Sequence, residues 1–120
     1  MNERGYTVRF MKRLAELLPD AWQWKVSDRF RGGIPDLEVL HAGITLRIEF
    51  KVDKHKLEKL QIIEIGRLRR ARAVVLVVRF LNKERNFSIE NGRDTFVSES
   101  YSTGNKAADA AAELISQQYL

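Results

Sequence analysis

The sequence predicts an α/β (α+β) fold in which a mixed sheet is flanked by helices. Three segments repeat their apolar residues at helical spacing, and segments with the alternation of strands lie between them. A third observation is the nearly continuous apolar run at residues 73–80, which is typical of a strand covered on both faces. A sheet with helices packed on its faces accounts for all three patterns.

The first elements are a helix and a strand. Residues 3–18 carry apolar side chains at helical spacing, and Pro19 ends that pattern. Residues 21–27 alternate between apolar and polar side chains, which predicts a half-buried strand. Trp22 and Trp24 lie on one face of this strand, and we expect that face to point into the core; the alternative is a platform on which bases stack.

The middle of the chain predicts a hairpin, a crossover helix and a central strand. Residues 37–40 and 44–52 alternate like strands and are separated by a connection short enough for a hairpin. Residues 54–70 return to helical spacing before the apolar strand at 73–80. A helix between two strands is expected to cross over one face of the sheet.

The last third predicts a second hairpin and a closing helix. Residues 86–90 and 95–98 flank a turn sequence and are expected to be short strands. Residues 106–119 are rich in alanine and predict a helix, with Asn105 as its N-cap.

Composition limits the classes of protein to consider. A chain of 120 residues with 44% hydrophobic residues is expected to form one domain, with a core at about 3–80 and an extension at about 81–120. The lack of cysteine excludes thiolate metal sites and cysteine nucleophiles, and a reducing cytoplasmic location is expected. No apolar run has the length of a membrane span, and a net charge of +5 favours a polyanionic partner.

The first hairpin places charged residues on one face. If Ala42-Gly43 is a two-residue turn, a slip of one residue would put apolar side chains opposite charges, so the hydrophobic pattern supports this register. A longer loop remains an alternative. The resulting pairs are Leu37 with Ile48 and Val39 with Leu46 on the apolar face, and Asp36 with Glu49 and Glu38 with Arg47 on the charged face.

Two opposed carboxylates are the main chemical feature of that register. The β-carbons of Asp36 and Glu49 would lie roughly 4.5–5.5 Å apart, and like charges in this arrangement repel each other. A hard cation such as Mg²⁺, or Mn²⁺ in its place, would relieve the repulsion and could bind phosphate oxygens. Lys51 projects from the same face as Glu49, so the three residues suit phosphodiester hydrolysis. The alternative is a solvated hairpin face without chemistry.

Two short motifs support the first interpretation. Gly33-Ile34-Pro35-Asp36 followed by Glu49-Phe50-Lys51 resembles the signature of the PD-(D/E)xK nuclease superfamily. Over residues 3–78 the chain is most similar to stand-alone VRR-NUC nucleases, and archaeal-type Holliday junction resolvases share much of the pattern.

The resemblance implies a restriction-endonuclease-like α-β-β-β-α-β core, with a C-terminal hairpin and helix added to it. It implies Asp36, Glu49 and the main-chain carbonyl of Phe50 as metal ligands, and Lys51 as the catalytic lysine. Glu3 would be an acidic metal ligand carried by the first helix, and Gln61 would be the catalytic glutamine of the crossover helix.

Glu3 and Gln61 also have simpler interpretations. An acidic residue in the first turn stabilises a helix through its dipole without any metal. A polar side chain between apolar helix positions needs a hydrogen-bond partner, which Gln61 could find in the protein itself.

Basic and glycine residues near the motifs are candidates for DNA contact. Lys25, Arg29 and Arg31 could neutralise phosphates, although they could equally serve solubility. Gly32 and Gly33 would let the backbone come close to a bound strand. A second basic group lies at the C-terminus of the crossover helix. Stabilisation of the helix dipole explains it at least as well as DNA contact does. This group consists of Arg67, Arg69, Arg70 and Arg72.

Together the residues and the resemblance predict a metal-dependent endonuclease that hydrolyses DNA phosphodiester bonds. Its expected substrates are Holliday junctions, flaps or other branched DNA in phage or bacterial recombination and repair. Cutting two strands favours a homodimer, with residues 106–120 and 73–80 as candidate interface elements. The alternative function is a non-catalytic nucleic-acid-binding module that keeps the fold.

Overall fold

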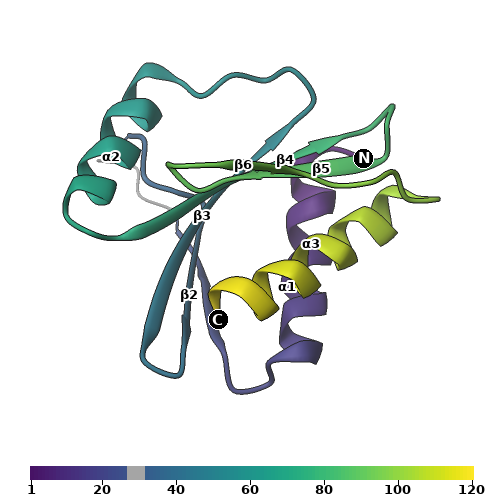
Figure 1. Ribbon diagram of the computed structural model, residues 1–120, viewed down its shortest axis with the longest axis horizontal. Helices are drawn as coiled ribbons and strands as arrows, with labels where there is room; N and C mark the ends of the chain where they lie inside the picture. The colour runs from purple at the N-terminus through teal and green to yellow at the C-terminus, as the bar shows by residue number, and fades with distance from the viewer. Residues whose placement is uncertain (27–31) are drawn as a thin grey trace.

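The computed structural model describes residues 1–26 and 32–120 (Figure 1). Within these ranges no helix combines the length and the apolar character needed to cross a bilayer. The described residues form three helices and six strands. In chain order they are α1 (Glu3–Leu17), β1 (Trp22–Lys25), β2 (Leu37–His41), β3 (Ile44–Val52), α2 (Lys59–Arg70), β4 (Val74–Leu81), β5 (Asn86–Glu90), β6 (Thr95–Val97) and α3 (Gly104–Tyr119).

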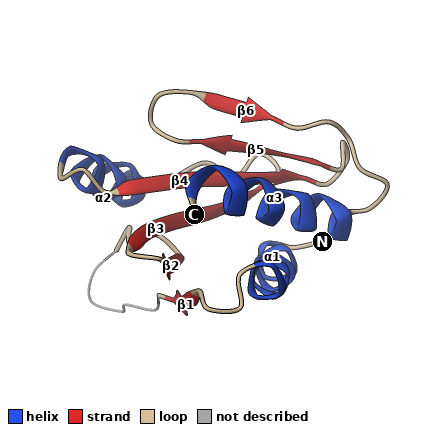
Figure 2. Ribbon diagram, turned by 60° about the horizontal axis from the view of Figure 1, so that its bottom comes forward, coloured by secondary structure: helices blue, strands red, loops and turns tan. Residues whose placement is uncertain are grey.

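The six strands form one mixed sheet in the order β1-β2-β3-β4-β5-β6. Neighbouring strands are antiparallel except for β3 and β4, which run parallel and are joined through α2. Helices α1 and α3 pack together on one face of the sheet, and α2 packs on the other face (Figure 2). The predicted fold class, a mixed sheet flanked by helices, is therefore confirmed.

The register predicted for the first hairpin is also confirmed. Leu37 pairs with Ile48 and Val39 pairs with Leu46, and all four side chains are buried in the core. The turn residues Ala42 and Gly43 have φ angles of 49° and 81°, as a type I′ turn requires. Across the other face, Arg47 Nε lies 3.2 Å from a carboxylate oxygen of Glu38.

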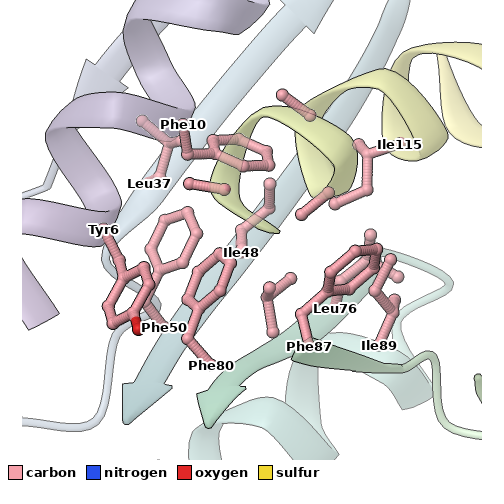
Figure 3. Close-up of a cluster of buried hydrophobic side chains, with 14 of the residues drawn as sticks. Tyr6, Phe10, Leu37, Ile48, Phe50, Leu76, Phe80, Phe87, Ile89 and Ile115 are labelled. Atoms are coloured by element: carbon pink, nitrogen blue, oxygen red, sulfur yellow. The ribbon is translucent and has the colours of Figure 1, made fainter. Parts of the chain in front are cut away.

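Aromatic packing fixes the start of α1 against the sheet (Figure 3). The ring of Tyr6 stacks on Phe80 with centroids 4.4 Å apart, and Phe10 meets Phe50 edge to face at 5.2 Å. These buried contacts hold the helix that carries Glu3 in one position relative to β3.

The prediction that Trp22 and Trp24 belong to the core is wrong, because both side chains are about half exposed, at 51% and 50%. Strand β1 lies at the edge of the sheet, and Gln23 takes the face toward α1, where its Nε2 donates to the Met11 carbonyl. The alternation of residues 21–27 correctly predicted that the two tryptophans share one face of β1. It did not predict which face of β1 is covered by α1.

Two helix starts also differ from the prediction. Helix α2 begins at Lys59 rather than at residue 54, because a capping box between Glu58 and Gln61 satisfies the first free N–H groups there. The N-cap of α3 is Thr103 rather than Asn105, since the Thr103 hydroxyl accepts a hydrogen bond from the Lys106 N–H.

The two segments expected to form a dimer interface are used within the chain. The alanine face of α3 is buried against α1 and the sheet, and β4 is a central strand between β3 and β5. Arg9 donates two hydrogen bonds to the Asp109 carboxylate, which holds α1 and α3 together. The alanine face of α3 and both edges of β4 are therefore occupied by contacts within the chain.

The glycine pair before β2 packs against the start of α2. Gly33 has a φ of +83°, and a β-carbon added there would overlap the backbone carbonyl of Leu60. At Gly32 an added β-carbon would lie 2.7 Å from the Leu60 side chain. The close approach predicted for this pair is thus an approach to protein backbone, one residue before Gln61.

We expect Gly33→Ala to lower the free energy of unfolding by about 3 kcal/mol, because it adds a steric overlap to an unfavourable positive φ. Gly43→Ala is the matched control, since Gly43 has a φ of +81° but nothing within 4 Å of its added β-carbon. Its loss should be about 1 kcal/mol. Urea unfolding measures both values, and equal losses would contradict the proposed close contact.

Candidate metal centre

Four separate elements bring the predicted site residues together. Asp36 lies in the bend that leads into β2, and Glu49 and Lys51 lie on β3. Glu3 comes from the first turn of α1, and Gln61 comes from the first turn of α2. The side chains of Glu49 and Lys51 point away from the α1–α3 core because Ile48 and Phe50 alternate with them on the strand.

Three carboxylates converge at this point. Glu3, Asp36 and Glu49 each contribute an oxygen atom, and these atoms all lie within 4.8 Å of one another. Asp36 is held in place by the backbone of β3, because its Oδ2 accepts a hydrogen bond of 3.0 Å from the Phe50 N–H. The register of the hairpin therefore fixes one acidic side chain directly beside another.

Glu49 is the most buried member, with an exposed fraction of 1%. Its Oε2 accepts a hydrogen bond of 3.0 Å from Gln61 Nε2, whereas its buried Oε1 has no hydrogen-bond partner among the described residues. Burial and the nearby negative charge of Asp36 raise the pKa of Glu49 from 4.5 to about 8. An unsatisfied, buried carboxylate oxygen of this kind calls for a cation or a proton.

Lys51 supplies one positive charge to the cluster. Its Nζ lies 3.8 Å from Glu49 Oε2, and the side chain is almost fully buried. Against three carboxylates, one ammonium leaves an excess of negative charge when all groups are ionised. The oxygen-only donor set, the excess charge and the unpartnered Oε1 of Glu49 together fit a hard divalent cation.

Glu3 shares this electrostatic environment. Burial and the charge of Asp36 raise the pKa of Glu3, while the positive charges of Lys51, His55 and Lys25 act in the opposite direction. Its position in the first helical turn still suits the helix dipole, so the two predicted roles are compatible. The structure adds that α1 points this carboxylate at the other two.

Gln61 connects the start of α2 to Glu49. Its Oε1 accepts a hydrogen bond of 2.9 Å from the Glu58 N–H, and its Nε2 donates to Glu49. The partner that this polar side chain was expected to need is thus partly its own helix and partly the acidic cluster. A glutamine in this position orients Glu49 and leaves the other carboxylate oxygen free.

The residues expected to contact DNA differ in where they lie. Lys25 is exposed at the end of β1 and lies close enough to Glu3 to influence its pKa. Arg29 and Arg31 lie outside the described residues. Gly32 and Gly33 pack on α2, and Arg69 binds Glu90 and the Val75 carbonyl, which is a structural role.

The motifs did not identify two residues near the centre. His55, in the exposed loop after β3, is one of the charges acting on Glu3, and a lone histidine offers no spacing that would reveal this. Glu58 forms the capping box with Gln61, and its signal was an acidic residue three positions before a glutamine at a helix start.

The sequence matches no protein-family model and no curated protein. Among solved structures, the chain is similar to one described as a VRR_NUC domain, with a TM-score of 0.61 and 22% sequence identity over 98% of this chain and 97% of that one. A second match is Hjc, a Holliday junction resolvase from Archaeoglobus fulgidus, with a TM-score of 0.48 and 17% identity over 77% of this chain and 87% of that one. The match to the VRR_NUC domain structure confirms the resemblance at the level of the fold.

Proposed function

We propose that this protein is a metal-dependent endonuclease that hydrolyses DNA phosphodiester bonds. The observation that carries the proposal is the convergence of Glu3, Asp36 and Glu49 within 4.8 Å, with Lys51 beside them. Branched DNA, such as a four-way junction or a flap, is the proposed substrate, and the motif resemblance supports it. The net charge of +5 suits a polyanion.

The proposed metal is Mg²⁺, with Mn²⁺ as a substitute, held by Asp36, Glu49, the Phe50 carbonyl and Glu3. When bound, such a cation withdraws charge from phosphoryl oxygens and makes water a stronger nucleophile. Lys51 would place its ammonium against the charge that develops on the phosphate, and its burial strengthens that interaction. Gln61 would keep Glu49 oriented toward the cation through the hydrogen bond to Oε2.

We expect Asp36→Asn, Glu49→Gln and Lys51→Met each to lower the cleavage rate by at least about a hundredfold, since each removes a charge from the reacting centre. The substrates are four-way junction, flap, single-stranded and linear duplex DNA, each with Mg²⁺, Mn²⁺ or EDTA. The rate of product formation on gels measures the effect, and a junction or flap should be cut fastest.

The control variant is Glu84→Gln, which changes an exposed acidic residue in the turn between β4 and β5. It should cut at the rate of the unmodified protein. The enzyme proposal is wrong if no substrate is cut with either metal, or if Asp36→Asn cuts as fast as Glu84→Gln. DNA binding without any cutting would instead support the non-catalytic module.

The shifted pKa of Glu49 predicts how stability depends on pH. Its pKa is about 8 in the metal-free fold and 4.5 ordinarily, so its contribution to stability is fully present below pH 4.5 and is lost as the pH rises to 8. Without metal, the melting temperature of the unmodified protein should therefore fall relative to that of Glu49→Gln between pH 5 and pH 9. Parallel curves for the two proteins would contradict the burial of a titrating carboxyl group.

Metal binding should show the opposite pH dependence. Because a cation must displace the proton of Glu49, its affinity should fall about tenfold for each pH unit below 8 and level off above it. Calorimetric titration with Mn²⁺ between pH 6 and pH 9 measures this slope. An affinity that does not change with pH would exclude Glu49 as the titrating ligand.

A homodimer remains part of the proposal, because cutting both strands of a junction needs two centres. Since the alanine face of α3 and both edges of β4 are occupied within the chain, the dimer would use surfaces outside these contacts. Light scattering of the purified protein, alone and with a four-way junction, tests the assembly directly.

A further inference from the structure

Two large aromatic side chains lie exposed and adjacent at one edge of the sheet. Trp22 and Trp24 are the only tryptophans of the chain, and both are about half exposed on β1. Their ring centroids are 6.0 Å apart and the ring planes are inclined by 42°. Indole rings are usually buried to a large extent, so an exposed pair on one strand indicates a binding surface.

The register places this pair on the same face of the sheet as the candidate metal centre. Trp24 pairs with Glu38, which pairs with Arg47, and Glu49 follows two residues after Arg47 on β3. Since side chains two residues apart on a strand share a face, Trp24 and Glu49 face the same side. Gln23 points to the opposite side, where α1 lies.

The distance between the pair and the centre suits a nucleic acid strand. On a flat sheet with strands about 4.8 Å apart and a rise of about 3.4 Å per residue, the α-carbons of Trp24 and Glu49 would lie about 12 Å apart. About four nucleotides of stacked DNA span that distance at a rise of 3.4 Å each, and an extended strand needs fewer.

The residues that lie between the pair and the centre on this face, Glu38 and Arg47, are partly exposed. Helix α2 packs on this face against Val75 and Val77 of β4. Arg47 lies between the tryptophans and Glu49 on this face, where it pairs with Glu38. The exposed Lys25 follows Trp24 at the end of β1 and, by alternation, starts from the opposite face of the strand. Positive charge next to aromatic rings is the combination that binds single-stranded nucleic acid.

We propose that Trp22 and Trp24 form a stacking platform for unpaired bases of a DNA strand whose backbone passes the metal centre. The inference rests on the proposed nuclease function and specifies its substrate as DNA with unpaired bases beside the cut. Aromatic rings stack on the faces of bases, and these faces are accessible only where the bases are unpaired or splayed apart. A fully paired duplex would offer the indoles no accessible base face.

Tryptophan fluorescence tests the platform directly, because both emitting residues belong to it. In EDTA, we expect an unlabelled single-stranded oligonucleotide to quench the emission, and a blunt duplex of equal length to leave it nearly unchanged. In fluorescence anisotropy with a labelled strand, Trp22→Ala and Trp24→Ala should each weaken single-strand binding about tenfold. Replacement by Phe should restore most of the affinity because a stacking ring remains.

Phe96→Ala is the matched control, since Phe96 is a half-exposed aromatic residue on the edge strand β6 at the other side of the sheet. It should not alter single-strand binding. Thermal melting of all variants verifies that they fold. Equal quenching by single strand and duplex, or equal loss of affinity in Phe96→Ala, would overturn the platform.

Two further measurements separate this inference from the nuclease proposal and from a protein partner. If single-stranded DNA quenches the emission but the protein cuts no substrate, the stacking platform is supported and the nuclease proposal is wrong. If a Trp22→Ala, Trp24→Ala double variant cuts flaps as fast as the unmodified protein, the nuclease proposal is supported and the stacking platform is wrong. If light scattering shows a dimer that the double variant loses, the surface binds a second copy and the DNA proposal is wrong.

Discussion

The hydrogen bond from the Phe50 N–H to Asp36 Oδ2 is the interaction on which the candidate centre depends. Asp36 lies in a bend before β2, where a carboxylate without a fixed partner would turn toward solvent. The bond anchors it to the peptide group that joins Glu49 to Phe50, next to both Glu49 and the residue before Lys51. The β2–β3 register decides which peptide group faces the bend. The pairing of the hairpin therefore also determines the position of the Asp36 carboxylate.

Strand β3 serves the core and the centre at the same time. Ile48 and Phe50 are fully buried against α1 and α3, and Glu49 and Lys51 alternate with them on the opposite face. Packing of the apolar face therefore offsets the cost of bringing like charges together on the other face. A shift of one residue would place Glu49 among aromatic rings, so natural selection for the core also maintains the order of the charged residues.

The sequence allowed the first hairpin, the central strand and the order of elements to be predicted, because alternation and turn residues act locally. Residues Asp36, Glu49 and Lys51 could be placed together for the same reason. The orientation of Trp22 and Trp24 could not be predicted, since both faces of an edge strand give the same alternation and only α1 determines which one is covered. The contact between Gly33 and Leu60 and the bridge from Gln61 to Glu49 join segments far apart in sequence, and no local pattern encodes such contacts.

The parallel pairing of β3 and β4 has a consequence for how the molecule folds. The hairpins β2–β3 and β4–β5 join neighbouring segments, whereas β3 and β4 can pair only after the chain has closed a long loop through α2. Gln61 lies on that connection and contacts Glu49 only when the loop is closed. The local β2–β3 hairpin therefore brings Asp36 and Glu49 together by itself, whereas their contact with Gln61 depends on a pairing between segments more distant in the sequence.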